Sequence, residues 1–151
     1  MFDDKGLITT CARCGQRNRI AYNRVGQGGG RCGSCEADLA PPAAPLEIDR
    51  ESVFDRLLGA APLPVVVDYW APWCGPCRVM APELGKAAAA GAGRFVVAKV
   101  NTDALPALAR RFQVASLPTL AVYRKGREIA RSAGARPAEA ITAFIRESIG
   151  P

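Results

Sequence analysis

The chain has 151 residues and a mass of 16.0 kDa, enough for one well-buried core and a small additional module. Hydrophobic residues make up 49% of it and charged residues 23%, a balance that excludes an intrinsically disordered protein. The net charge of +6 is spread along the chain, and we interpret it as a contribution to solubility rather than as a nucleic-acid surface.

The sequence contains no apolar segment as long as a membrane span, and residues 1–6 carry acidic residues instead of the apolar core of a signal peptide. We therefore expect a cytoplasmic protein with no membrane partner. In such a reducing compartment, cysteines serve metal binding or catalysis more often than structural disulfides. Four of the six cysteines lie in the first forty residues and two follow later, and the chain has no histidine.

The N-terminal cysteines have the spacing of a metal site. They form two C-x2-C pairs separated by seventeen residues, a spacing at which four thiolates bind one Zn²⁺ tetrahedrally. The predicted ligands are Cys11, Cys14, Cys32 and Cys35. Gly15 and Gly33 lie beside cysteines, and we expect them to adopt positive φ angles that turn backbone amides toward the sulfur atoms. The alternating pattern of residues 17–25 predicts a strand.

A bound ion would explain how so short a module folds. About forty residues bury too little apolar surface to fold alone, and a structural zinc ion would supply most of the missing stability. A shell of four cysteines would be closed and would hold no catalytic water. Two alternatives remain, namely a pair of disulfides and a zinc site that opens on oxidation and acts as a sensor.

An Ala- and Pro-rich stretch marks the predicted domain boundary. Residues 39–46 contain three prolines and little to bury, which favours an extended, semi-rigid linker. We predict a zinc ribbon in residues 1–38, this linker, and a larger domain in residues 47–151.

The larger domain alternates helix and strand patterns. In chain order they predict a helix with Asp49 as its N-cap, a strand at 65–70, a helix at 77–90, a strand at 94–101, a helix at 103–112, a hairpin at 118–134 and a helix at 136–150. The hairpin should turn at Lys125-Gly126. No strand is evident before the first helix. The order predicts an α/β fold with a mixed central sheet flanked by helices, parallel except for the final pair.

Cys74 and Cys77 lie between the strand at 65–70 and the helix that follows it. At the N-terminus of this helix, Cys74 would face unpaired N–H groups and the positive end of the helix dipole, which lowers a thiol pKa to about 3.5–7.5. Cys74 would then be a nucleophile without a histidine. Gly75 allows a close turn and Pro76 needs no N–H, which leaves the amide of Cys77 free to point at Cys74. Cys77, one turn further along, should be more enclosed and should resolve the mixed disulfide.

Asp68 is the candidate base. It lies among valines in a strand, so burial should raise its pKa and allow it to accept the Cys77 proton, directly or through water. The alternative role is that of an ordinary strand-end residue or helix cap. Lys99, on the next strand, could pair with Asp68 and lower its pKa. Trp73, in a loop, is expected to be exposed for contact with partners.

The motif WAPWCGPC at residues 70–77, the Asp of VDYW and the later SLPT at 116–119 resemble the thioredoxin family. Together with the four-cysteine module, they resemble the zinc-containing thioredoxin 2 type of bacteria. The resemblance covers nearly the whole chain. It implies a thioredoxin fold and a protein-disulfide reductase without a bound organic cofactor, whose substrates are disulfide-containing proteins. Its electrons would come from NADPH through thioredoxin reductase. We expect the protein to be a monomer.

The same resemblance assigns roles to individual residues. The residues that it places in catalysis are Cys74, Cys77, Asp68 and Lys99. The residues that it places against the substrate are Trp73, Gly75, Pro76, Pro118 and Gly134. Pro118 matches a cis-proline that faces the disulfide. The chain departs from the family pattern at Tyr69, where Phe is commoner, and at Pro72, where a charged residue is commoner.

Two other functions compete with disulfide reduction. The same chemistry could run in reverse, in an oxidase or isomerase, but the Gly75-Pro76 dipeptide and the expected reducing compartment disfavour it. The zinc ribbon could instead be a binding module for nucleic acid or protein. Tyr22 is the only aromatic residue in its predicted strand region, which weakens the nucleic-acid version.

Overall fold

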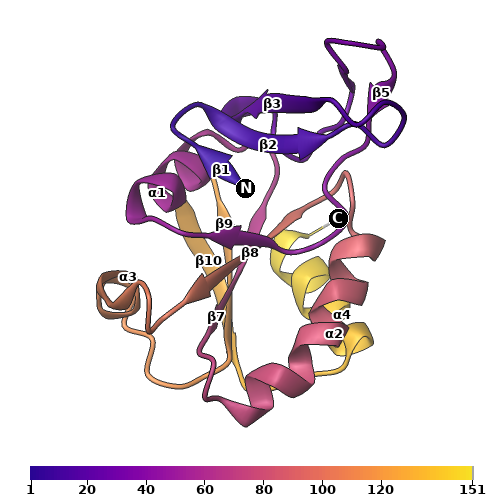
Figure 1. Ribbon diagram of the computed structural model, residues 1–151. Coiled ribbons are helices and arrows are strands. Elements are labelled where there is room, and N and C mark those ends of the chain that lie inside the picture. The colour runs from indigo at the N-terminus through magenta and orange to yellow at the C-terminus, as the bar shows by residue number, and fades with distance from the viewer. Residues whose placement is uncertain (151) are drawn as a thin grey trace.

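A five-stranded mixed sheet forms the centre of the computed structural model, which describes residues 1–150 (Figure 1). Its strands, in spatial order, are β10 (Arg127–Ala133), β9 (Thr119–Arg124), β7 (Val65–Trp70), β8 (Val96–Asn101) and β6 (Leu46–Ile48). The strands β7, β8 and β6 run parallel, whereas β9 is antiparallel to both β7 and β10. The predicted α/β fold with a final antiparallel pair is confirmed.

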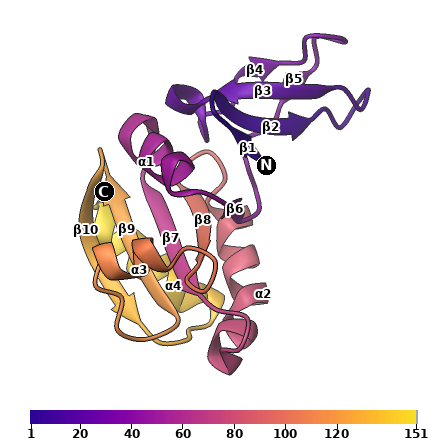
Figure 2. The same cartoon turned by 60° about the vertical axis from the view of Figure 1, so that its left-hand side comes forward.

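Two helices cover each face of this sheet (Figure 2). The helices α1 (Glu51–Ala60) and α3 (Pro106–Arg111) lie on one face, and α2 (Gly75–Ala90) and α4 (Ala138–Ile149) lie on the other. Alternate residues of β7 supply the two cores, because successive side chains of a strand point to opposite faces. Val65 and Val67 pack with α1 and α3, whereas Val66 packs with α2 and α4. Within residues 1–150, no helix is long and apolar enough to cross a bilayer.

Two features before α1 differ from the prediction. The strand β6 was not expected, because it has three residues and follows a Pro-rich stretch, so its apolar pattern is too short to recognise. It pairs with β8 and forms one edge of the sheet. Asp49 is not the N-cap of α1. Arg50 holds that position without a side-chain hydrogen bond, and the Asp49 carboxylate instead accepts a hydrogen bond from Arg50 Nε at 3.3 Å.

The other predicted elements agree with the structure to within a few residues at their ends. The helix α2 begins at Gly75, two residues earlier than predicted, so that Cys77 lies inside its first turn. The hairpin of β9 and β10 turns at Lys125 and Gly126, whose φ angles of 52° and 78° are both positive. Such a two-residue turn matches the twist of the strands that it joins.

The first forty residues form two small sheets. Strands β1 (Phe2–Asp3), β2 (Gly6–Thr10) and β3 (Arg17–Ala21) make one sheet, and β4 (Gly30–Arg31) pairs with β5 (Asp38–Leu39). The strand predicted at 17–25 therefore ends at Ala21 and continues as a 3₁₀ turn, η1 (Tyr22–Arg24). This N-terminal module contains all four of the early cysteines.

The N-terminal module packs against the larger domain through a shared apolar core. Phe2, Tyr22 and Val25 are buried in the same cluster as residues of α1 and β8. Polar contacts add to this packing, because Arg50 donates a hydrogen bond to the carbonyl of Phe2 at 3.0 Å and Arg56 donates one to the carbonyl of Asp4. In Figure 1 the module lies at the end of the sheet opposite to the start of α2. The division of the chain at 39–46 remains a prediction.

Candidate active site and four-cysteine cluster

Cys74 and Cys77 are joined by a disulfide at the start of α2. Cys74 is the N-cap of the helix, and its Sγ accepts a hydrogen bond from the backbone N–H of Cys77 at 3.2 Å. This is the amide that the sequence predicted to point at Cys74. The sequence predicted that Cys77 would be more enclosed than Cys74. In this oxidised form both cysteines are buried to about the same degree, so that prediction is wrong here. Their positions on the helix distinguish them, because the Cys74 sulfur caps the unpaired N–H groups of the first turn, whereas Cys77 lies within that turn and donates one of them.

The loop before β9 brings two of the predicted substrate-binding residues, Pro118 and Gly134, together. Leu117 packs against the disulfide, and the Leu117–Pro118 peptide bond is cis, as the resemblance implies. The N–H of Gly134 donates a hydrogen bond to the carbonyl of Pro118 at 2.9 Å. Gly134 has a φ of 97°, a conformation that a side chain would disfavour. Pro118 and Gly134 therefore lie side by side, and Pro118 directly follows the leucine that packs against the dithiol.

Trp73 lies on the surface beside Cys74, with an exposed fraction of 67%. Its indole N–H donates a hydrogen bond to Asp103 at 3.2 Å. Arg78 donates two hydrogen bonds to the carbonyl of Pro72, at 3.0 and 2.6 Å, and so fixes the loop before the cysteines. Sequence reasoning missed Asp103 and Arg78. The only sequence signal for Arg78 was its position directly after Cys77.

Asp68 is buried on the face of the sheet that α2 and α4 cover. Its exposed fraction is 3%, and its Oδ1 has no hydrogen-bond partner among residues 1–150. Burial raises the pKa of Asp68 to about 7, while the charge of Lys99 opposes this rise and that of Glu47 reinforces it. The carboxyl is therefore able to exchange a proton near neutral pH, as the sequence predicted.

Lys99 does not form the expected ion pair with Asp68. Its ammonium lies 3.8 Å from Glu47 Oε1 and 4.6 Å from the centre of the Trp70 ring, and within residues 1–150 it comes within 4.0 Å of no other carboxylate. No sequence pattern predicted this arrangement, because Glu47 belongs to the strand that was not recognised.

The Tyr69 hydroxyl, absent from the commoner Phe at this position, has a specific partner. It lies 2.6 Å from the hydroxyl of Tyr123 inside the core. Burial, reinforced by this hydrogen bond, raises the pKa of the Tyr69 hydroxyl, so that it stays neutral. The extra hydroxyl therefore has its hydrogen-bond partner within the core on the side of α1 and α3.

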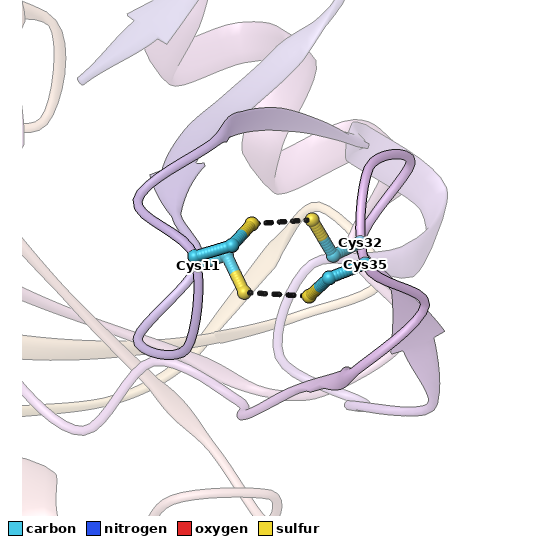
Figure 3. A group of neighbouring side chains, drawn as sticks. Cys11, Cys32 and Cys35 are labelled. Carbon is cyan, nitrogen blue, oxygen red and sulfur yellow. Dashed lines mark hydrogen bonds between the residues drawn. The ribbon is translucent and has the colours of Figure 1, made fainter.

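The four N-terminal cysteines meet in one cluster, of which Figure 3 labels Cys11, Cys32 and Cys35. Their sulfur atoms all lie within 4.8 Å of one another, with Cys11 to Cys35 at 3.7 Å and Cys14 to Cys32 at 3.6 Å. All four are free thiols. A tetrahedron with metal–sulfur bonds of about 2.3 Å has sulfur–sulfur edges of about 3.8 Å. The cluster thus has the composition and spacing to hold one metal ion.

The two C-x2-C loops have the same backbone geometry. In each loop the residue after the second cysteine donates its N–H to the carbonyl of the first, from Gly15 to Cys11 at 2.9 Å and from Glu36 to Cys32 at 3.0 Å. These two residues have positive φ angles of 78° and 61°. The expectation for Gly33 was therefore wrong, because Gly33 lies inside its loop and the residue that corresponds to Gly15 is Glu36.

Backbone amides around the cluster favour ionised sulfur. The N–H groups of Cys35 and Ser34, with the Asn18 side chain, lower the pKa of Cys32 to about 6. The pKa of Cys11 is also lowered, chiefly by hydrogen bonds from two amides of its own loop. The amide of Ala37 lowers the pKa of Cys35, but burial and the neighbouring thiols outweigh it and raise the pKa to about 12. The surroundings therefore favour ionised sulfur at Cys11 and Cys32 and a protonated thiol at Cys35.

Comparison with known proteins decides the family of the chain. The Thioredoxin family matches residues 45–147, which include the sheet, α2 and the dithiol. The chain belongs to the thioredoxin family. Members of this family are thiol-disulfide oxidoreductases, and the chain is therefore an enzyme of that class.

Individual thioredoxins show how far the similarity extends. Thioredoxin C-3 of Corynebacterium nephridii is 38% identical over 129 residues, which cover 85% of this chain and 86% of that protein. This match is longer than the stretch from residue 45 to the C-terminus, so it reaches into the N-terminal module. Thioredoxin 1 of Chlorobaculum tepidum is 41% identical over 96 residues, 64% of this chain and 95% of its own length.

A solved thioredoxin has the same fold. The structure of a mutant thioredoxin from Halobacterium salinarum NRC-1 superposes with a TM-score of 0.67 at 26% identity. It covers 75% of this chain and 97% of its own chain. Nearly all of a thioredoxin is therefore contained in this chain, which carries additional residues.

Proposed function

We propose that this thioredoxin reduces disulfides in other proteins through Cys74 and Cys77. The observation that carries the proposal is the Cys74 sulfur at the N-cap of α2, where it accepts the amide of Cys77 beside Leu117 and the cis-proline. The same amide would stabilise a Cys74 thiolate once the disulfide is reduced.

In the first step the Cys74 thiolate attacks one sulfur of a substrate disulfide. A bond forms between Cys74 and that sulfur, the substrate disulfide breaks, and the second substrate sulfur leaves as a thiolate that takes up a proton. The exposed Trp73 and the backbone at Gly75, Pro76, Pro118 and Gly134 would hold the substrate in an extended form. Support for this role comes from the exposure of Trp73, the packing of Leu117 against the disulfide and the hydrogen bond from Gly134 to Pro118.

In the second step Cys77 attacks its neighbour in the mixed disulfide. Its thiol must lose a proton first, and Asp68 is the buried carboxyl whose pKa of about 7 suits it as the acceptor. The new Cys74–Cys77 bond breaks the mixed disulfide and releases the first substrate sulfur, the one bound to Cys74, as a thiolate, which is protonated. The reaction ends with the Cys74–Cys77 disulfide found in this structure and with a substrate that carries two thiols.

Electron supply and location complete the proposed function. Electrons would come from NADPH through thioredoxin reductase, and the protein would act as a monomer on disulfide-containing proteins in the cytoplasm. No organic cofactor would be bound. Free thiols at 3.6–3.7 Å in the cysteine cluster are compatible with a reducing compartment.

We also propose that the cysteine cluster holds one structural Zn²⁺, which would place the chain in the zinc-containing thioredoxin 2 subtype. Residues 1–38 would be the zinc ribbon, 39–46 the linker and 47–151 the thioredoxin domain. The sulfur spacing and the amides that lower two thiol pKa values support this assignment. When bound, the ion would neutralise and cross-link the four thiolates. Oxidation of those thiolates would release it, so the cluster is also a candidate oxidant sensor.

The proposed activity is tested by coupling the protein to NADPH and a bacterial thioredoxin reductase with a disulfide-bonded protein as substrate. We expect NADPH consumption that depends on both the substrate and this chain, and we expect Cys74→Ser to abolish it. As a control, Cys14→Ser changes the metal cluster and leaves the dithiol in place. Reduction that persisted in Cys74→Ser would refute the assignment.

A further inference from the structure

Three ionisable side chains lie in a row across three neighbouring strands. In the strand register, Lys99 of β8 is paired with Glu47 of β6 on one side and with Asp68 of β7 on the other. Residues paired in this way across adjacent strands carry their side chains on the same face of the sheet. The row therefore runs from the edge strand β6 directly to Asp68.

The face on which this row lies is fixed by the apolar neighbours. Leu46 and Ile48 pack into the core on the side of α1, so Glu47 between them faces the side of α2 and α4. Lys99 follows Val97, and Asp68 follows Val66, at spacings of two residues, and both valines pack on the side of α2 and α4. Solvent exposure falls along the row. The side chains of Glu47 and Lys99 are 60% and 19% exposed, and Asp68 is 3% exposed.

The Lys99 ammonium is drawn toward the outer end of this row. It lies 3.8 Å from Glu47 Oε1 and over the Trp70 ring, while Asp68 Oδ1 has no hydrogen-bond partner in residues 1–150. A lysine side chain is a flexible four-carbon stem, so the same ammonium could instead turn inward toward the carboxylate beside it. The contacts that favour the outward position of the ammonium are the ion pair with Glu47 and the cation–π contact with Trp70.

We propose that Glu47 is a positioning residue that holds the Lys99 ammonium away from Asp68 and thereby leaves the Asp68 carboxyl free to take the proton of Cys77. This inference rests on the proposed function, in which Asp68 is the proton acceptor. The charged groups that face Asp68 from neighbouring strands are Lys99 and Glu47. The buried residues of α2, which include Cys77, carry no charge. The facing residues of β9 and α4 are apolar, with Leu120 directly opposite Asp68.

Loss of the Glu47 charge should let the ammonium move inward. A cation beside a buried carboxylate stabilises its ionised form and lowers its pKa. Asp68 would then be ionised at neutral pH but would be a weaker base toward a thiol. The resolving step would become slower, and the acid limb of its pH profile would move to lower pH.

The test is a titration of the Asp68 carboxyl carbon by NMR in the full-length oxidised protein, which needs no substrate and no reductase. We expect Glu47→Gln to lower the Asp68 midpoint by about 0.5–1 pH unit. The matched control is Glu147→Gln, which removes the same charge from an exposed position on α4 and should leave the midpoint unchanged. An unchanged midpoint in Glu47→Gln would overturn the inference.

A second comparison separates positioning from a direct effect of the Glu47 charge. If Glu47 acts by holding Lys99, Glu47→Gln should have little effect in a Lys99→Met background. An equal fall of the midpoint in both backgrounds would show that Glu47 acts on Asp68 through space and would contradict a positioning role. The titration is independent of turnover, so the two proposals can fail separately. If the Asp68 midpoint does not change in Glu47→Gln while the wild-type protein reduces disulfides, only the role of Glu47 is refuted. If the midpoint falls but the wild-type protein reduces no disulfides, the proposed function is refuted.

Discussion

Two cysteines three positions apart differ here because a helix begins between them. Cys74 is the N-cap of α2, and its Sγ accepts a hydrogen bond from the amide of Cys77, whereas Cys77 lies inside the first turn of the helix. The sequence predicted this difference from the C-x-x-C spacing and the strand before it. It could not predict that both cysteines are equally buried in the disulfide form, since burial depends on how the loop before β9 packs against them.

Removal of the second cysteine should trap the intermediate of the first step. In Cys77→Ser, Cys74 still attacks the substrate, but no thiol remains in the first turn to release it. We expect a covalent complex in which Cys74 is disulfide-bonded to the substrate protein. A small thiol reductant should cleave this bond and separate the two proteins. Non-reducing electrophoresis measures it, with the Cys74→Ser/Cys77→Ser double variant as the control. A complex of equal yield in the double variant would show that another cysteine attacks.

Burial of Asp68 predicts a stability that depends on pH. The pKa of Asp68 is raised from 3.8 to about 7 in the folded protein, so the folded state favours the protonated form. The contribution of Asp68 to stability is therefore fully present below about pH 4 and is lost as the pH rises to about 7. Asp68→Asn, which cannot ionise, should be more stable than the wild type at about pH 8, by about 4 kcal/mol at most.

Denaturant unfolding of the two oxidised proteins measures this difference. We expect the gap between Asp68→Asn and the wild type to close as the pH falls toward about 4. A gap that stayed constant with pH would mean that the Asp68 carboxyl is not the group whose ionisation is penalised.

Strands and helices of the larger domain could be predicted where their pattern was long. The strand β7 has five buried residues in succession, and α4 repeats its apolar positions at helical spacing, so both were recognised. The short strand β6 was not, because three residues after a Pro-rich stretch carry too little pattern. That omission also concealed the partner of Lys99, since the ion pair with Glu47 exists only once β6 is paired with β8.

The cysteine loops show the same limit at the level of a single turn. Their spacing predicted the cluster, but the position with positive φ depends on the hydrogen bond from the residue after the second cysteine. We expect Gly15→Ala to destabilise the protein by about 1 kcal/mol, because alanine at a φ of 78° is strained although the space around it is open. A change of this size lowers Tm by about 2–4 °C in a chain of this length.

The matched control is Gly33→Ala. Gly33 does not have a positive φ, and an added Cβ would meet only Asn18 Oδ1 at 3.8 Å, an ordinary contact. Thermal unfolding of both variants should therefore show a lower Tm in Gly15→Ala alone. Equal losses would place the positive-φ requirement elsewhere in the loops.

For the whole molecule, the N-terminal module and the dithiol lie at opposite ends of the central sheet (Figure 1). The module shares an apolar core with α1 but does not cover Cys74. The sequence predicted two parts joined by a linker and could not predict their packing, because that packing depends on scattered residues such as Phe2, Tyr22 and Val25. Because the module and the dithiol lie at opposite ends of the sheet, we infer that the module contributes more to the stability of the fold than to disulfide reduction.

Metal removal should therefore lower stability more than activity. We expect chelation of the cysteine cluster under reducing conditions to lower Tm, because an unfolded module would expose its share of the common core. Disulfide reduction measured well below that Tm should keep most of its rate. Loss of the rate in step with the metal, in a chain still folded by circular dichroism, would assign the cluster a direct part in the reaction.

Native mass spectrometry of a single reaction follows both cysteine groups at once. The reduced protein is mixed with an excess of a disulfide-bonded protein, and its mass is measured before its disulfides are mapped. We predict one retained Zn²⁺, one new disulfide joining Cys74 to Cys77, and one equivalent of reduced substrate. A protein that gained no disulfide, or that lost the metal and formed disulfides among Cys11, Cys14, Cys32 and Cys35, would contradict the proposed division between a reactive dithiol and a structural metal site.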